Sequence, residues 1–209
     1  MTPESEIQNR KKAFEARSNR YRELGYDRRE EARFATASAG PIAGPALDVG
    51  TGKGFVAIAL ARLGIEVVSV DVDADEQAVA ALLARESEVE NKIKFICGDA
   101  RQLPFPEGHF GCAVMMDVLH HLADATAVLK EMARVLKPNG IFIAADFSAE
   151  GFDLVARVHR AEGREHPRSD VTLEGARRIL EELGFGLVRR CLGHYHHVIA
   201  LTKKATGAS

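Results

Sequence analysis

Short apolar runs alternate with longer amphipathic stretches through the middle of the chain. Four runs have the length of a buried strand, at residues 46–49, 66–70, 93–97 and 140–146. The stretches with apolar positions at helical spacing are residues 54–63, 76–86 and 123–136. This alternation predicts an α/β fold, Rossmann-like, with a doubly wound and mostly parallel sheet covered by helices on both faces.

The two ends of the chain depart from this alternation. Residues before position 35 are polar and helical in character, and residues 35–45 predict a loop into the first strand. Near the other end, Thr172 is a favourable N-cap for a helix that runs to residue 183, and Gly184 would stop it. The last apolar runs, 185–191 and 197–202, predict a C-terminal antiparallel hairpin.

A turn with glycines at every second position follows the first predicted strand. Gly50, Gly52 and Gly54 allow positive φ and a close approach of the backbone to a ligand. The helix that follows offers unpaired N–H groups at its N-terminus, so the turn predicts a seat for a nucleotide-like molecule. It is not a dinucleotide fingerprint, because the third glycine would fall on Phe55, and it lacks the Ser or Thr that follows Lys53 in a phosphate loop.

Acidic residues stand at the ends of three predicted strands. Asp71 follows the second run at about the spacing, roughly 20 residues, at which a carboxylate accepts hydrogen bonds from ribose hydroxyls. Asp99 follows the third run, and Asp48 lies within the first. Because the carboxyl ends of parallel strands meet at one crevice, we expect the three carboxylates to line one ligand. With Asp73 they disfavour a pyrophosphate and suit a ligand with a positive centre.

The chain resembles the class I S-adenosylmethionine-dependent methyltransferases, specifically the small-molecule (type 11, UbiE-like) group. Five motifs carry the resemblance in the family's order: D-x-G-x-G-x-G at 48–54, the ribose acid Asp71, G-D-A at 98–100, V-L-H-H-L at 118–122 and R-V-L-K-P-x-G at 134–140. Two positions depart from the pattern. Gly111 replaces an acid that is usual near the start of its strand, and Asn139 replaces the first glycine of the K-P-G-G turn.

The resemblance implies the class I methyltransferase fold, S-adenosylmethionine as cofactor and a small-molecule acceptor. Gly50 and its neighbours would approach the methionine part, Asp71 would hold the ribose, and Val72 and Asp99 would contact the adenine. The positions implied to bind the cofactor are Asp48, Gly50, Thr51, Gly52, Gly54, Asp71, Val72, Asp99, Ala100, Met115 and Met116. We expect a single domain over residues 1–209, divided into an N-terminal helical lid (1–40), a cofactor-binding core (41–146), and a substrate cover with the terminal hairpin (147–209).

Methyl transfer from a sulfonium is an in-line displacement, so the protein must mainly align the nucleophile and, where needed, remove its proton. Candidate bases follow the strand that ends at Met116, and we expect Asp117 or His120 to act. The alternative is structural: Asp117 would cap a turn, and His120 and His121 would only open the next helical segment.

Candidate substrate contacts come from the two terminal parts of the chain. In this family the N-terminal segment often folds over the cofactor, which places Tyr21 or Tyr26 against the methionine end. Arg157, Arg160 and Arg164 have the spacing of one helix face, and Arg160 is the candidate to receive a substrate carboxylate or phosphate. An ordinary solvated helix face is the alternative.

The histidine group near the C-terminus invites a metal interpretation, since His194 and His196 would share one face of a strand. Zinc takes three or four ligands, and the segment around His197 does not supply them, so we predict no metal. We expect these histidines to lie near the pocket rim or on the surface.

Composition narrows the function classes further. The chain has 209 residues, 46% hydrophobic content and a net charge of −2, which suits one full-sized core and gives no general attraction to nucleic acid or anionic membrane. Cys97, Cys112 and Cys191 lack a C-x-x-C pattern, so we expect reduced core residues in a cytoplasmic protein. No apolar run reaches the roughly 20 residues of a membrane span. A monomer or a homodimer fits the sequence, and RNA or protein methylation and noncatalytic cofactor binding are the alternative functions.

Overall fold

The computed structural model describes residues 3–163 and 171–205. Within them, seven strands form one sheet in the order β3-β2-β1-β4-β5-β7-β6. The strands are β1 (Ala46–Val49), β2 (Val67–Asp71), β3 (Ile93–Cys97), β4 (Phe110–Met116), β5 (Leu136–Phe147), β6 (Phe185–Gly193) and β7 (His196–Lys203). The first five run parallel, and β7 lies antiparallel between β5 and β6. The predicted sheet and its terminal hairpin are confirmed.

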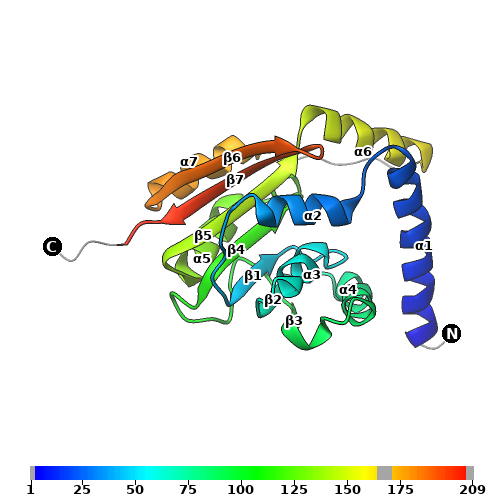
Figure 1. Cartoon of the computed structure of the whole chain (residues 1–209), viewed down its shortest axis with the longest axis horizontal. Helices are drawn as coiled ribbons and strands as arrows, with labels where there is room; N and C mark the ends of the chain where they lie inside the picture. Colours follow the sequence, from blue (N-terminus) through cyan, green and yellow to red (C-terminus); the bar gives the residue numbers. More distant parts are fainter. Residues whose placement is uncertain (1–2, 164–170, 206–209) are drawn as a thin grey trace.

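Helices cover both faces of this sheet and extend past its end (Figure 1). The connections between the parallel strands are α3 (Phe55–Arg62), α4 (Ala74–Glu86) and α5 (Ala125–Val135), with short 3₁₀ turns η1 (Glu90–Lys92) and η2 (Leu119–His121). The remaining helices are α1 (Pro3–Glu23), α2 (Arg28–Ala37), α6 (Ala149–Ala161) and α7 (Leu173–Glu182). None of the helices in the described ranges is long and apolar enough to cross a membrane.

The core is split into two apolar layers by the sheet. On one face, residues of α2, α3 and α4 pack with side chains such as Ala46 and Val114. On the other face, residues of α5 and α7 pack with side chains such as Leu47 and Ala113. Neighbouring residues of a strand face opposite layers because side chains alternate along it, and both layers are apolar because the parallel strands are buried on both sides.

Local sequence signals set where the helices begin. The hydroxyl of Thr172 accepts the Gly175 N–H at 3.1 Å, which confirms this residue as the N-cap of α7, and Gly184 beyond its end has φ 88°. One boundary prediction is wrong: the strand expected at 140–146 begins earlier, at Leu136. The Lys137 to Gly140 turn signal forms an irregularity within β5, where Asn139 has φ 61° and the register with β4 shifts.

Gly111 departs from the family pattern for a steric reason. A Cβ atom at this position would overlap the carbonyl oxygen of Ala43, in the loop before β1, and would also press on the Gly44 carbonyl. The backbone N–H of Gly111 donates to the Pro45 carbonyl at 2.9 Å, which brings the two segments together. A side chain of any kind is excluded by this close backbone approach.

Candidate active site

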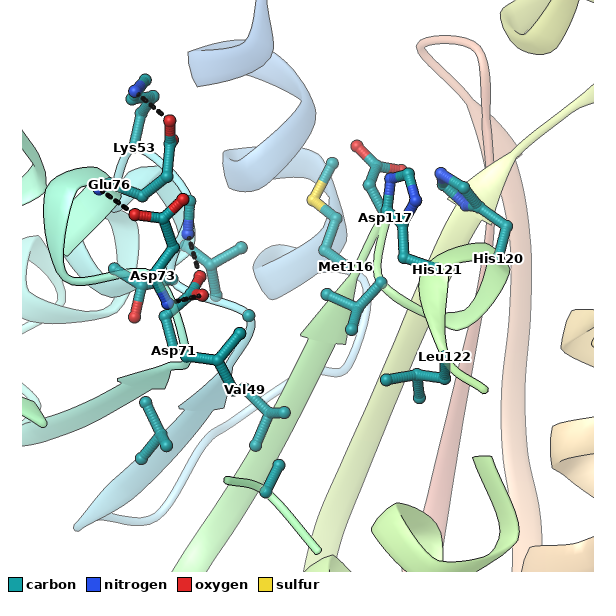
Figure 2. Close-up of a pocket in the computed structure, with 18 of the residues that line it drawn as sticks. Val49, Lys53, Asp71, Asp73, Glu76, Met116, Asp117, His120, His121 and Leu122 are labelled. Carbon is teal, nitrogen blue, oxygen red and sulfur yellow. Dashed lines mark hydrogen bonds and ion pairs between the residues drawn. The ribbon is translucent and has the colours of Figure 1, made fainter. Parts of the chain in front are cut away.

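The carboxyl ends of β1 to β4 open into one cavity of about 880 Å³. Figure 2 shows its two walls: Asp71, Asp73 and the Lys53 to Glu76 ion pair on one side, and the segment from Met116 to Leu122 on the other, with Val49 between them. Arg28 of α2 and Val155 and His159 of α6 complete the lining. A volume of this size accommodates a ligand as large as a nucleoside with a side chain.

The glycine turn after β1 forms one edge of the cavity. Gly50, Gly52 and Gly54 all have positive φ, of 83°, 48° and 76°. Gly50 and Gly52 line the cavity together with Thr51, whereas Gly54 lies against Ala80 of α4. At Gly50 the requirement is also steric, because a Cβ atom there would overlap the side chain of Val118.

Asp48 supports this turn and does not line the cavity. Its Oδ2 accepts the Ser69 hydroxyl at 2.7 Å, and the Ser69 and Thr51 hydroxyls lie 2.7 Å apart. Gln77 adds a bond from Nε2 to the Thr51 hydroxyl at 3.3 Å. Only 1% of Asp48 is exposed, and burial raises its pKa to about 7. The predicted direct contact of Asp48 with the cofactor is therefore corrected to a buried hydrogen-bond chain beneath the turn.

Asp71 is held with both carboxylate oxygens oriented. Oδ2 accepts the Gly52 N–H at 2.9 Å, and Oδ1 accepts the Asp73 N–H at 3.0 Å. Each carboxylate oxygen can accept more than one hydrogen bond, so this pre-oriented group can still bind a pair of hydroxyls. Lys53, the cation of the turn, is paired with Glu76 at 2.6 Å.

An apolar surface and a second acid follow on the same wall. Val72 is 73% exposed although it lines the cavity, which suits a residue that packs on a flat ligand. Asp99 and Ala100 line the cavity beside it. The Arg101 guanidinium, with Nε 2.9 Å from Asp99 Oδ2, lowers the pKa of that carboxyl and keeps it ionised as an acceptor.

Two residues of opposite charge, Asp117 after β4 and Arg28 in α2, line the same cavity. Asp117 has φ 57°, uncommon for a residue with a side chain, and its Oδ1 lies 2.8 Å from Nε2 of His196. Arg28 opens α2 and lines the same cavity. Among the described residues no carboxylate forms an ion pair with Arg28, although its guanidinium lies 5.0 Å from the centre of the Tyr21 ring. Met116 lines the cavity next to Asp117, whereas Met115 is buried in the core.

The other predicted base is part of a buried dyad. Nδ1 of His120 lies 2.8 Å from Oδ1 of Asp146, at the end of β5, and only 3% of His120 is exposed. Asp146 Oδ1 also accepts the Phe147 N–H at 2.9 Å, which fixes the carboxylate. Partial burial, and then the neighbouring His120, lower the pKa of His121, so this imidazole is neutral at neutral pH.

The structure corrects the predicted substrate contacts. Tyr21 and Tyr26 are buried and do not line the cavity: the Tyr26 ring packs against the rings of Tyr21 and Phe147 at 5.3 and 6.1 Å. Tyr26 is instead a core residue that supports the wall formed by Phe147. Arg160 does not line the cavity either.

Helix α6 packs on the rest of the molecule through an apolar face, so its arginines lie on the opposite, exposed face. Leu154, Val155 and Val158 are buried, so Arg157 and Arg160 project to the exposed side, as the solvated-face alternative expects. Arg164 lies outside the described residues.

His194 and His196 do not share a strand face. His194 and Tyr195 form the two-residue turn between β6 and β7, with φ 49° and 64°, and His196 is the first residue of β7. Within residues 3–163 and 171–205, no three His, Cys, Asp or Glu side chains are grouped to hold a metal ion. His196 is instead buried between Glu31 and Asp117.

Sequence reasoning missed three residues of this site. Arg28 is one of many basic residues in a segment of mixed charge. The only local feature that distinguishes it is its position at the start of α2, directly after the N-cap Asp27. Asp146 shows the stronger signal, an acid at the end of an apolar run, as Asp71 does. Glu31 carries no signal, because its partner lies 165 residues further along the chain.

The strand order, with an antiparallel β7 inserted beside β5 and a ligand-sized cavity at the strand ends, defines a class I methyltransferase fold. Residues 47–144 match the family model described as a methyltransferase domain. This match, over slightly less than half of the chain, confirms the resemblance seen in the sequence.

Named relatives agree with this assignment. The uncharacterized methyltransferase YcgJ of Bacillus subtilis is 37% identical over 103 residues, which cover 49% of this chain and 40% of the relative. The ubiquinone/menaquinone biosynthesis C-methyltransferase UbiE of Pseudomonas paraeruginosa is 30% identical over 118 residues, 55% of this chain and 46% of the relative. The chain thus matches less than half the length of these relatives.

A solved structure is similar over almost the whole chain. The SAM-dependent methyltransferase from Aquifex aeolicus has a TM-score of 0.67, with 97% of this chain and 100% of that chain covered at 20% identity. At this identity the likeness shows the fold. It extends to the N-terminal helices and the terminal hairpin, beyond the segment matched by the family model.

Proposed function

We propose that the protein transfers a methyl group from S-adenosylmethionine to a small-molecule acceptor. The observation that carries the proposal is the cavity wall formed by Asp71 and Val72, where a pre-oriented carboxylate stands beside an exposed apolar surface. The family match over residues 47–144 supports it. The relative named for ubiquinone and menaquinone biosynthesis supports an acceptor of small-molecule type.

The lining residues fit the parts of the donor one by one. Asp71 accepts the ribose hydroxyls, Val72 packs on the adenine, and Asp99 and the Ala100 backbone contact its edge. The donor's remaining part is an amino-acid head, with an ammonium and a carboxylate. Arg28 and Asp117 present a guanidinium and a carboxylate at the same cavity, and we assign them to that head.

When bound, the donor supplies a methyl group on a positively charged sulfur. The acceptor's lone pair forms the new bond to the methyl carbon while the carbon–sulfur bond breaks, and the sulfur retains that electron pair as a neutral thioether. The protein's part is to align the two molecules and to remove a proton from an acceptor that must lose one. No covalent bond between chain and substrate is needed.

His120 fits the role of base better than Asp117 does. The Asp146 carboxylate accepts a hydrogen bond from Nδ1 of His120, so Nε2 is the ring nitrogen that would take the acceptor's proton. Asp117 already accepts a hydrogen bond from His196 and is assigned to the donor's ammonium group. Phe147, whose ring lies 5.8 Å from that of His120, and Val155 line the same cavity and suit an acceptor with an apolar part.

Titration calorimetry with S-adenosylhomocysteine tests the donor site directly. We expect heat of binding for the wild type and binding at least about tenfold weaker for Asp71→Asn, because a charge-assisted acceptor for two hydroxyls is replaced by a neutral amide. Asp153→Asn, a change at an exposed acid of α6, is the matched control and keeps wild-type affinity. Absence of binding by the wild-type protein would refute the proposed function.

A further inference from the structure

A buried histidine links three parts of the chain that are distant in sequence. Nδ1 of His196 lies 3.1 Å from Oε2 of Glu31 in α2 and 2.9 Å from the His194 carbonyl, and Nε2 lies 2.8 Å from Oδ1 of Asp117 after β4. The His196 side chain is completely buried, as is nearly all of Glu31. The ring of Tyr26 stacks on the imidazole at 6.2 Å, so the ring cannot turn freely.

Both ring nitrogens act as donors in this arrangement. The His194 carbonyl can only accept, so Nδ1 carries a proton, and the carboxylate of Asp117 accepts from Nε2. Asp117 and Glu31 raise the pKa of His196 to about 10, against the opposing effect of its burial. At neutral pH His196 is therefore a buried imidazolium between two carboxylates, each of which comes from a different element.

The same histidine fixes how far apart two cavity residues stand. Glu31 lies three positions after Arg28 in α2, so both residues project from one side of that helix. Asp117 has a left-handed backbone, with φ 57°, that aims its side chain at His196 and at the cavity. Hydrogen bonds run from Glu31 through His196 to Asp117, and Arg28 lies one helical turn before Glu31; Arg28 and Asp117 both line the cavity.

We propose that His196 is a positioning residue for the methyl donor. It holds Arg28 and Asp117 at the separation that receives the carboxylate and the ammonium of the donor's amino-acid head. This inference rests on the proposed function. It adds that the terminal hairpin, which has no residue in the cavity lining, controls donor affinity through α2 and the end of β4.

Two ligands separate this role from a general structural one. S-adenosylhomocysteine has the amino-acid head, whereas 5′-methylthioadenosine has the same adenosine and thioether without it. For His196→Gln we expect about tenfold or greater weakening of S-adenosylhomocysteine binding, because a charge-assisted hydrogen bond to Asp117 is lost. Binding of 5′-methylthioadenosine should change by less than about twofold, since Asp71 and Val72 are untouched. Titration calorimetry measures both.

His197→Gln is the matched control, because it makes the same change at the exposed neighbour in β7 and should alter neither affinity. Glu31→Gln is the second variant, because it keeps the side-chain volume and leaves the contact of His196 with Asp117 in place. It should selectively weaken the binding of S-adenosylhomocysteine, and it tests the proposal even where His196→Gln does not fold. Equal weakening of both ligands, or no weakening of either, overturns the role of His196 while leaving the donor site in place. A wild type that binds neither ligand overturns the proposed function itself.

Discussion

At the scale of single residues, the acids at the strand ends have different roles although the sequence presents them alike. Asp71 lines the cavity with both oxygens oriented, whereas Asp48 is buried beneath the turn and bonded to Ser69. The difference is one of strand register: side chains alternate between the faces of β1, and Asp48 points toward the layer of α3 and α4. When the buried Asp48 carboxyl is ionised, it lowers the free energy of unfolding.

Asp48 should therefore make stability depend on pH. Its pKa is raised from 3.8 to about 7 by burial, so the folded state binds the proton more tightly than the unfolded chain and loses stability as the pH rises between these values. Asp48→Asn removes this loss and keeps an acceptor for Ser69. We expect the variant's unfolding free energy to gain about 3 kcal/mol on the wild type's between pH 5 and pH 8, with most of the gain below pH 7.

Urea denaturation at the two pH values measures this difference, with Asp153→Asn as the exposed control. A gap between Asp48→Asn and the wild type that stays constant with pH would show that Asp48 is not the titrating group.

The dyad of His120 and Asp146 makes a prediction about turnover. His120→Gln keeps a polar side chain but no basic nitrogen, so kcat should fall by about 10²–10⁴-fold for an acceptor that loses a proton. Asp146→Asn should cause a smaller loss, because the ring remains but its tautomer is no longer fixed. Donor affinity should stay at the wild-type value in both variants. A fall in kcat equal to that of His197→Gln would remove the base from the mechanism.

At the scale of elements, α1 is attached to the rest of the molecule through ion pairs as well as through the buried side chains of Phe14 and Tyr21. Arg10 and Lys11 pair with Asp75 and Glu86 of α4 at 2.9 and 2.6 Å, and Arg17 pairs with Glu162 after α6 at 3.2 Å. Glu86 is the main cause of the raised pKa of Lys11. The helix thus runs past α4 toward α6, as Figure 1 shows.

This attachment should weaken in salt. Each surface ion pair contributes little to stability, and at 1 M salt the screening length falls to about 3 Å, which weakens these pairs further. Salt does not screen apolar packing. We expect amide hydrogen exchange in α1 to accelerate between 0.1 and 1 M salt, while α5, which packs through Val128, Leu129 and Met132, stays unchanged. S-adenosylhomocysteine should slow the exchange of α1, because Arg17 lines the cavity. Exchange in α1 that is insensitive to salt would contradict the charge-based attachment.

At the scale of the whole molecule, the sequence predicts the features that depend on neighbouring residues and regular spacing. The strands, the glycine turn and Asp71 follow from short runs of residues whose spacing is fixed by backbone geometry, and the terminal hairpin follows from its alternation. Contacts between distant segments leave no such pattern. His120 was identified without its partner Asp146. Tyr26 was expected at the cofactor by family resemblance, and its burial could not be foreseen because it depends on how distant segments pack.

The packing of Gly50 against Val118 joins the two halves of the site. Gly50 belongs to the turn that we assign to the donor, and Val118 opens the stretch that carries His120, the base we propose. A methyl group added to Gly50 would have to displace the side chain of Val118. The two positions are therefore coupled in any redesign of the site. A smaller side chain at position 118 causes no clash with Gly50, whereas a larger residue at position 50 requires a smaller one at position 118.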